Sequence, residues 1–280
     1  MRLKNALLNI TKRLASAGVP NPDSDASWLL EVVTGLGYSG LKLNANQELT
    51  DTQLERLEGF VVRRETREPL QWIIGFTEFY GLKLEVEVGI LIPRFETEKL
   101  VELVLEQLPN TPLQVVDIGT GTGAIALALK AERPKLEIVA TDINQAALEL
   151  TRKNAANLKL ELETVQTSIL DGVDRMFDAV VSNPPYLPAS DNGRLDIEVQ
   201  LEPEEALFSG ADGLKLAREI VSAASQKLKS GGLLALELDP RNASILADNL
   251  GLSIWQDVRL EADLVGRERF VLARRKLRHD

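Results

Sequence analysis

A strand, a glycine-rich turn and a helix follow one another in the stretch LQVVDIGTGTGAIALAL, residues 113–129. The β-branched run before the glycines predicts a buried strand, and the small apolar residues after them predict a helix. Gly119, Gly121 and Gly123 allow the backbone to turn tightly and to come close to a ligand. The combination is typical of doubly wound α/β folds, and no other stretch restricts the fold of this chain as strongly.

Strand-like and helix-like segments continue to alternate after this unit. The strand-like ones are LEIVATD, LELETVQ, FDAVVS and GGLLALEL, with further strands expected near Ile254 and Phe270. Helical patterns begin at about Thr122 and at Gln145. Such alternation predicts a parallel sheet with helices on both faces, and we place this domain at residues 94–280.

The first third of the chain has a different pattern. Apolar residues recur at helical spacing, and TDTQ at residues 50–53 resembles a capping box. We expect residues 1–68 to form a small helical domain that docks a substrate. The segment WIIGFTEFYGLKLEVEVGILIPR then alternates apolar and polar residues around glycines. This alternation predicts a β-hairpin linker over residues 69–93.

Composition excludes several kinds of chemistry. The chain has no cysteine, and its single histidine is His279, next to the C-terminus. Disulfides, thiolate nucleophiles and zinc ribbons are therefore excluded, and we expect neither a metal site nor a Ser–His triad. The net charge of −10 lacks the basic footprint of a nucleic-acid-binding protein. No apolar run is long enough for a membrane span, and a cytoplasmic location is compatible with the composition.

Two acidic residues bear on the cofactor. The glycine turn fits G-x-G-x-x-A, with Ala124 in the last position, so NAD is one candidate. Asp142 ends the next strand and can accept hydrogen bonds from both hydroxyls of a ribose, which suits NAD and S-adenosylmethionine equally. Asp117 would repel a pyrophosphate but can bind an ammonium group. The sequence therefore favours S-adenosylmethionine, while a purely structural glycine turn is the alternative.

The strand FDAVVS ends in the motif N-P-P-Y, residues 183–186. An NH₂ on a planar conjugated group can accept a methyl group only when its delocalised lone pair is freed. The rotation barrier of an amide C–N bond, ~18–20 kcal/mol, shows how strong this delocalisation is. The side-chain oxygen of Asn183 and the carbonyl of Pro184 can accept from the two N–H bonds and orient the nitrogen. Tyr186 can lie against the flat face of the same group. The alternative is a Pro-Pro turn that only ends the strand.

N-P-P-Y at this position is similar to the signature of amino-methyltransferases that use S-adenosylmethionine. The rest of the chain resembles one of their families, the bacterial peptide chain release factor glutamine methyltransferases. The resemblance is carried by GFTEFYGLKLEVEVGILIPRFETEKLVE, DIGTGTGAIALAL, SNPPY, EVQLEPEEALFSGADGL and LVGRERF. It implies a Rossmann-like class I methyltransferase domain, mainly parallel with an antiparallel last strand, after a helical domain and a hairpin. It further implies methylation of the glutamine side-chain amide in the Gly-Gly-Gln motif of class 1 release factors.

The family's functional residues carry over onto matching positions. The resemblance implies cofactor binding by Asp117, Gly119, Thr120, Gly121, Thr122, Gly123, Asp142, Ile169 and Asn183, and glutamine binding by Asn183, Pro184, Pro185 and Tyr186. Asn183, Pro184 and Tyr186 would be the catalytic group. The chain departs from the family in two places: TSIL offers only Ser168 and Ile169 near the adenine, and LELDPRN replaces a common H-G. We expect a monomer that does not bind nucleic acid directly.

Three other functions stay open at this point. A nucleic-acid amino-methyltransferase would meet the same geometric problem at a base NH₂. Against it, residues 187–205 carry one basic side chain, Arg194, and six acids: Asp191, Asp196, Glu198, Glu202, Glu204 and Glu205. An NAD oxidoreductase would leave N-P-P-Y unexplained. A non-catalytic scaffold would leave the whole transfer site without a use.

Overall fold

The computed structural model describes residues 1–277, and the single histidine, His279, lies outside this range. The chain divides into two compact units. The helical unit contains Met1–Phe76 and, separately, Asp196–Leu201. The second unit contains Thr77–Leu195 and the described residues from Glu202 onward. The boundaries expected from the sequence, after residues 68 and 93, follow the chain pattern rather than contacts, and they stay a prediction.

Apolar residues at helical spacing form the core of the helical unit. Leu14, Leu29 and Leu57 are buried there with other aliphatic side chains. The expected capping box is formed, because Thr50 accepts from the backbone of Gln53 and the Gln53 side chain accepts from the backbone of Thr50. The helices are α1 (Leu3–Ser16), α2 (Pro22–Thr34), α3 (Tyr38–Leu43), α4 (Asp51–Glu65) and α5 (Leu70–Ile74).

The hairpin is shorter than the alternating pattern suggests. It consists of β1 (Phe76–Phe79) and β2 (Leu82–Glu85), and α5 occupies the residues before it. Leu70 and Ile73, three positions apart, both pack into the core of the helical unit. A short apolar run fits a helix turn as well as a strand, and burial on one side decides in favour of the helix here.

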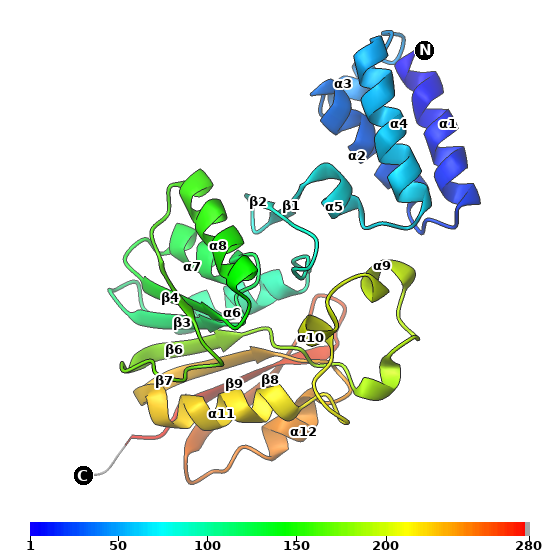
Figure 1. Cartoon of the computed structure of the whole chain (residues 1–280). Helices are drawn as coiled ribbons and strands as arrows, with labels where there is room; N and C mark the ends of the chain where they lie inside the picture. The colour runs from blue at the N-terminus through cyan, green and yellow to red at the C-terminus, as the bar shows by residue number, and fades with distance from the viewer. Residues whose placement is uncertain (278–280) are drawn as a thin grey trace. The chain divides into compact units, whose positions relative to one another are not determined.

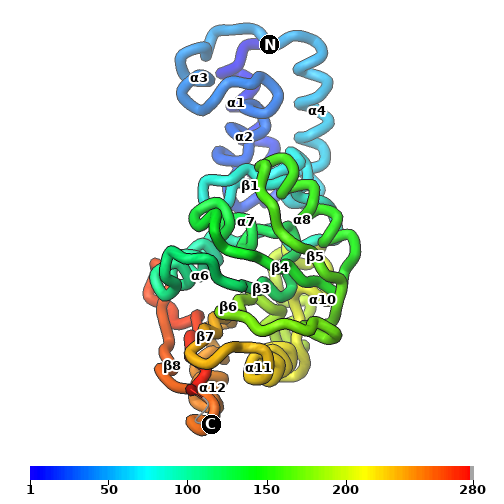
Figure 2. Tube along the Cα trace, turned by 90° about the vertical axis from the view of Figure 1, so that its left-hand side faces the viewer, coloured from blue at the N-terminus to red at the C-terminus, as the bar shows by residue number. Residues whose placement is uncertain are grey.

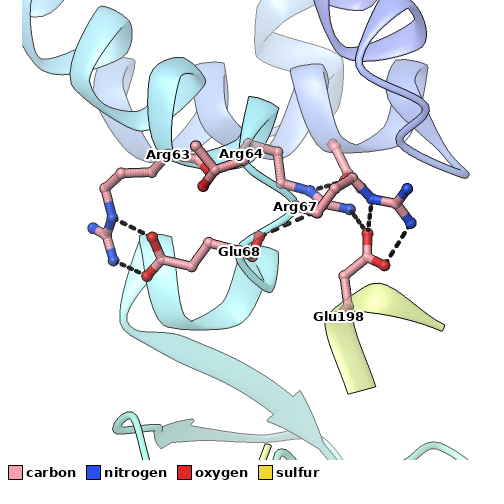
Figure 3. Close-up of polar contacts among 7 residues, drawn as sticks. Arg63, Arg64, Arg67, Glu68 and Glu198 are labelled. Atoms are coloured by element: carbon pink, nitrogen blue, oxygen red, sulfur yellow. Dashed lines mark hydrogen bonds and ion pairs between the residues drawn. The ribbon is translucent and has the colours of Figure 1, made fainter. Parts of the chain in front are cut away.

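An ion-pair cluster holds a distant piece of chain in the helical unit (Figure 3). The Arg64 guanidinium donates to Asp25 at 2.7 Å and to Glu198 at 2.9 Å. Arg67 donates to both carboxylate oxygens of Glu198, at 2.7 and 2.6 Å. Glu198 lies on α9 (Ile197–Gln200), whose chain neighbours on both sides belong to the second unit. The chain therefore enters the helical unit a second time, shortly after the N-P-P-Y motif.

The second unit is built around a seven-stranded sheet with the order β5-β4-β3-β6-β7-β9-β8. The first five of these strands are parallel, while β9 runs antiparallel to both of its neighbours. The mainly parallel sheet with an antiparallel last strand is thereby confirmed. The strands are β3 (Gln114–Ile118), β4 (Glu137–Asp142), β5 (Glu163–Gln166), β6 (Phe177–Ser182), β7 (Leu228–Glu237), β8 (Trp255–Ala262) and β9 (Glu268–Arg275).

Helices cover both faces of this sheet (Figures 1 and 2). Val115 faces one core and Val116 the other, because successive side chains on a strand point to opposite faces. The first core includes α6 (Thr97–Gln107), α7 (Ala124–Glu132) and α8 (Gln145–Leu158); the second includes α11 (Lys215–Lys227) and α12 (Ala243–Asp248). The loop between β6 and α11 holds the one-turn helices η1 (Ala189–Asp191) and α10 (Glu204–Leu207) in addition to α9. No helix within residues 1–277 has both the length and the apolar character needed to cross a membrane.

Candidate active site

Three adjacent parallel strands end at the same edge of the sheet. Ile118, the last residue of β3, is in register with Thr141 of β4 on one side and with Ser182 of β6 on the other. The residues that follow these strand ends, the glycine turn, Asp142 and Asn183, therefore emerge side by side. Ligands of open α/β sheets bind at this carboxyl edge.

The glycine turn requires glycine for two different reasons. The φ angles of Gly119, Gly121 and Gly123 are 70°, 58° and 84°, in the left-handed region that other residues rarely adopt. At Gly123 there is also no room, because a Cβ would lie 2.9 Å from a methyl carbon of Thr151. A Cβ at Gly119 would meet nothing within 4 Å, so the turn is open on that side. The turn can thus present bare backbone to a ligand.

Asp117 is the penultimate residue of β3, two positions before Gly119, and it is fully buried. Its Oδ2 accepts a hydrogen bond from the hydroxyl of Thr120 at 2.7 Å. Within the described residues, its Oδ1 is buried without a hydrogen-bond partner. Burial raises the pKa of this carboxyl to about 7, against the opposing effects of the Thr120 hydroxyl and of the nearby backbone N–H of Ala126, which makes no well-formed hydrogen bond to Oδ1. A buried carboxylate oxygen that lacks a donor is suited to a cationic group of a ligand.

Asp142, at the end of β4, is held by backbone groups. Its Oδ2 accepts from the N–H of Gly121 at 3.0 Å, and its Oδ1 accepts from the N–H of Asn144 at 2.9 Å. Burial raises the pKa of Asp142, and these N–H groups act in the opposite direction. Each carboxylate oxygen keeps a second lone pair, so Asp142 can accept from two neighbouring hydroxyls of a ligand.

A cavity of about 280 Å³ lies over these groups, entirely within the second unit. It brings together most of the predicted site. The predicted residues that line it are Gly119, Thr120, Gly121, Thr122, Asp142, Ile169, Asn183 and Pro185. They are joined by Ile90 and Arg94 from the segment before α6 and by Thr97, the first residue of α6. The predicted residues Asp117, Gly123, Pro184 and Tyr186 are not among the described lining residues.

Asn183 is fixed at the rim of this cavity. Its Nδ2 donates to the hydroxyl oxygen of Thr97, the first residue of α6, at 3.0 Å. The amide nitrogen thus already has a hydrogen-bond partner within the protein. The oxygen end, Oδ1, is the part that can accept a hydrogen bond from a ligand in the cavity.

The rest of the N-P-P-Y corner is held in place by the second core and by residues 213 and 242. Tyr186 packs against the second core, and burial raises the pKa of its hydroxyl. Its carbonyl oxygen accepts from the side chain of Asn242 at 3.1 Å. A Cβ at Gly213 would lie only 2.1 Å from the same carbonyl oxygen. The corner can take this shape only because residue 213 has no side chain.

Ile169 has an unusual backbone conformation at the cavity. Its φ is 57°, which is strained for a β-branched residue. The Thr141 hydroxyl donates to the Ile169 carbonyl at 3.1 Å and holds it in place. Backbone strain of this kind is concentrated at binding sites. The position agrees with a ligand-contacting role, and the role itself stays a prediction.

Sequence reasoning missed several residues around Asn183. Thr97, Asn242 and Gly213 each contact the N-P-P-Y corner but come from other parts of the chain. Glu237 could have been found from the sequence, because a carboxylate inside the apolar run GGLLALEL indicates a buried acid. It ends β7 and is fully buried. Thr97 gave no such signal, because a lone threonine at the start of a helix is common.

The strand order and the site define the chain as a class I methyltransferase. A family model described as "Methyltransferase small domain" matches residues 96–200, and one described as "PrmC N-terminal domain" matches residues 5–75. Two solved structures agree in fold. The catalytic domain of human Mettl16 has a TM-score of 0.57 at 17% identity, over 88% of this chain and 87% of that one. A methyltransferase from Pyrococcus furiosus has a TM-score of 0.53 at 19% identity, over 70% of this chain and 89% of that one.

Curated relatives give the family. The release factor glutamine methyltransferase of Deinococcus radiodurans is 45% identical over 98% of this chain and 99% of its own length. The enzyme of the same name from Mycolicibacterium smegmatis is 39% identical over 98% of both, and that from Escherichia coli is 37% identical over 91% of this chain and 92% of its own. The chain belongs to the family of release factor glutamine methyltransferases.

Proposed function

We propose that this protein methylates the side-chain amide nitrogen of the glutamine in the Gly-Gly-Gln motif of class 1 release factors, with S-adenosyl-L-methionine as the donor. The observation that carries the proposal is the position of Asn183. Asn183 lines the cavity together with the glycine turn and Asp142, and it follows β6, which pairs directly with the strand before the turn. Family membership supports a glutamine of a release factor as the substrate, since the relatives are named release factor glutamine methyltransferases.

The residues present fit the donor. The buried Oδ1 of Asp117, which has no partner in the described chain, suits the ammonium group of the amino acid part. Asp142 suits the two ribose hydroxyls, and the open glycine turn allows close approach. When bound, S-adenosyl-L-methionine supplies an electrophilic methyl group next to a sulfonium. Ile169 is proposed to contact the adenine.

The chain's own groups would orient the acceptor nitrogen. Asn183 Oδ1 and the Pro184 carbonyl are proposed to accept from the two N–H bonds of the glutamine amide. Two acceptors in these positions favour the pyramidal form of the nitrogen as positive charge develops. Pro185 and Tyr186 would hold the rest of the side chain. No strong base is required, because an N-methylated amide nitrogen that carries the extra proton is very acidic.

We also propose a division of labour along the chain. Residues 1–68 would dock the release factor, residues 69–93 would link, and residues 94–280 would carry out the transfer. The protein would act as a monomer in the cytoplasm, where release factors function. Light scattering of the purified protein would test the monomeric state.

Mass spectrometry of a release factor after incubation with the protein and S-adenosyl-L-methionine tests the function. We expect one added methyl group on the Gly-Gly-Gln glutamine. With Asn183→Ala, turnover should fall by about 10²–10³-fold, as for loss of one oriented polar group at a reacting centre. Methyl transfer that persists after replacement of that glutamine would contradict the proposal. Transfer to DNA or RNA instead would point to the nucleic-acid alternative.

A further inference from the structure

Thr97 links the site amide to a buried carboxylate that the proposed reaction does not use. The hydroxyl oxygen of Thr97, 4% exposed, accepts from Asn183 Nδ2 at 3.0 Å. Glu237, the last residue of β7, is 0% exposed and lies near enough to the Thr97 hydroxyl for that hydroxyl to lower its pKa. All three residues belong to the second unit.

Glu237 is poorly satisfied for a buried acid. Neither of its carboxylate oxygens makes a well-formed hydrogen bond within the described residues. The Thr97 hydroxyl is nevertheless near enough to favour the charged form, although the contact falls outside normal hydrogen-bond limits. The nearest cation, Arg269, is 3.9 Å away, and it donates to Asp263 at 2.9 Å. Thr97 is thus the neutral donor that Glu237 has available.

The two ends of an asparagine amide have the same shape, so packing alone cannot decide which end faces the cavity. Only hydrogen-bond partners can decide. A hydroxyl has one proton, and a carboxylate can only accept. When the Thr97 proton points towards Glu237, the Thr97 oxygen is left as an acceptor, and it takes the N–H of Asn183. The oxygen of Asn183 must then face the cavity.

We propose that Thr97 and Glu237 are positioning residues that set the orientation of the Asn183 amide, so that Oδ1 faces the glutamine to be methylated. The proposal rests on the proposed function, since it assumes that Asn183 Oδ1 orients the substrate. Without an acceptor at residue 237, the Thr97 hydroxyl could donate to Oδ1. Asn183 would then present two N–H donors to the NH₂ of the substrate, and the substrate would be repelled.

The ionisation of Glu237 gives this arrangement a pH dependence. Burial raises the pKa of Glu237 to about 7, with Glu96 acting in the same direction and Thr97, Arg269 and Arg94 opposing it. A further titratable group near it is the hydroxyl of Tyr186, whose pKa is raised in part by Glu237. Above pH 7 the carboxylate is ionised and attracts the nearby Thr97 proton. Below pH 7 it is protonated and can itself donate, which removes the preference for the productive orientation.

The test is the pH profile of kcat between pH 5.5 and 9, measured with a release factor substrate at saturating S-adenosyl-L-methionine. Saturation matters because Asp117 also has a pKa of about 7 and would affect binding of the donor. We expect kcat of the unaltered protein to fall on the acid side of about pH 7. In Glu237→Gln this acid limb should disappear. In Glu202→Gln, which alters another buried carboxylate of raised pKa, it should remain.

Substitutions at Thr97 separate orientation from folding. Thr97→Val keeps the shape and removes the hydroxyl, and we expect kcat at pH 8 to fall about tenfold, the size of one misplaced hydrogen bond. Thr97→Ser restores the hydroxyl and should keep kcat within about threefold. The Kd for S-adenosylhomocysteine should be unchanged in both variants, which shows that the cavity is intact.

Asn183→Ala distinguishes failure of this inference from failure of the proposed function. If Asn183→Ala is inactive while Thr97→Val has the kcat of the unaltered protein, the positioning role is wrong and the proposed function stands. An acid limb that survives in Glu237→Gln would likewise overturn the role of Glu237. If Asn183→Ala retains full activity, the role of Asn183 itself fails.

Discussion

At the scale of single residues, the candidate site contains carboxylates that are wholly or largely removed from solvent. Asp117 is the clearest case, because its pKa is raised to about 7 and one of its oxygens has no partner within the described residues. An isolated buried carboxylate destabilises a fold. We propose that a cationic group of the bound methyl donor compensates this carboxylate.

Asp117→Asn tests this explanation through the pH dependence of binding. An ammonium group needs the ionised carboxylate, so affinity for S-adenosylhomocysteine should fall as the pH drops from 8 to 6. In Asp117→Asn the affinity at pH 8 should be about tenfold lower, the size of one charge-assisted hydrogen bond, and nearly independent of pH. Isothermal titration calorimetry would measure both. Asp178→Asn removes a charge from a strand of the same sheet outside the cavity and should bind as the unaltered protein does.

The same substitution should stabilise the ligand-free protein. The folded-state pKa of Asp117, about 7, lies above its ordinary value of 3.8. The folded protein therefore holds a proton that the unfolded chain has lost, and stability falls as the pH rises from about 4 to 7. Asp117→Asn removes this loss, so its thermal unfolding at pH 8 should occur at a higher temperature. Weaker binding together with lower stability would instead indicate damage to the fold.

At the scale of elements, the N-P-P-Y corner depends on the loop that precedes α11. The φ of Gly213 is 76°, and a Cβ there would overlap the carbonyl oxygen of Tyr186. Gly213→Ala should therefore displace the corner and reduce both kcat and stability. Gly193→Ala is the matched control, since its φ is 77° and a Cβ would meet nothing within 4 Å. Both variants carry backbone strain of about 1 kcal/mol, because both place an alanine at positive φ. Any difference between them in urea unfolding or in kcat therefore measures the steric overlap of the new Cβ with the Tyr186 carbonyl oxygen. Equal effects would contradict it.

Local sequence was sufficient to predict the strands and the turn that position the candidate site. The turn after β3, the acid at the end of β4 and the asparagine after β6 each follow a strand within one or two residues. The pairing of Asn183 with Thr97 spans 86 positions, and that of Arg64 with Glu198 spans 134. Such contacts leave no periodic pattern in the chain, because they arise only when the sheet order brings distant elements together. The length of the hairpin was missed for a related reason, since burial of Leu70 and Ile73 favours a helix turn.

At the scale of the whole molecule, two separate segments of the chain, residues 1–76 and 196–201, make up the helical unit. Glu198 anchors the second entry through Arg64 and Arg67. Burial raises the pKa of Glu198, but hydrogen bonds from the two arginines outweigh it and lower the pKa to about 2. Asp25 shares Arg64 and shows the opposite result, because its burial outweighs its single ion pair. Glu198 is therefore the acid of this cluster whose charge contributes stability.

The contribution of Glu198 has a defined pH range. Its folded-state pKa lies below the ordinary value of 4.5, so its stabilisation is complete above pH 4.5 and is lost as the pH falls towards 2. Glu198→Gln should lower the free energy of unfolding of the helical unit by roughly 2 kcal/mol at pH 7, a figure reduced for solvent screening, and by much less near pH 2. Urea unfolding at the two pH values would measure the difference. Glu204→Gln, an exposed acid of the same loop, should have little effect.

The anchor should matter for the protein substrate more than for the methyl donor. Every residue that lines the cavity belongs to the second unit, so Glu198→Gln should leave the Kd for S-adenosylhomocysteine unchanged. Amide hydrogen exchange in residues 196–201 should become faster, because these residues lose their hold on the helical unit. If the helical unit docks the release factor, KM for the release factor should rise in the same variant. Faster exchange with an unchanged KM would separate the two and show that the anchor serves stability alone.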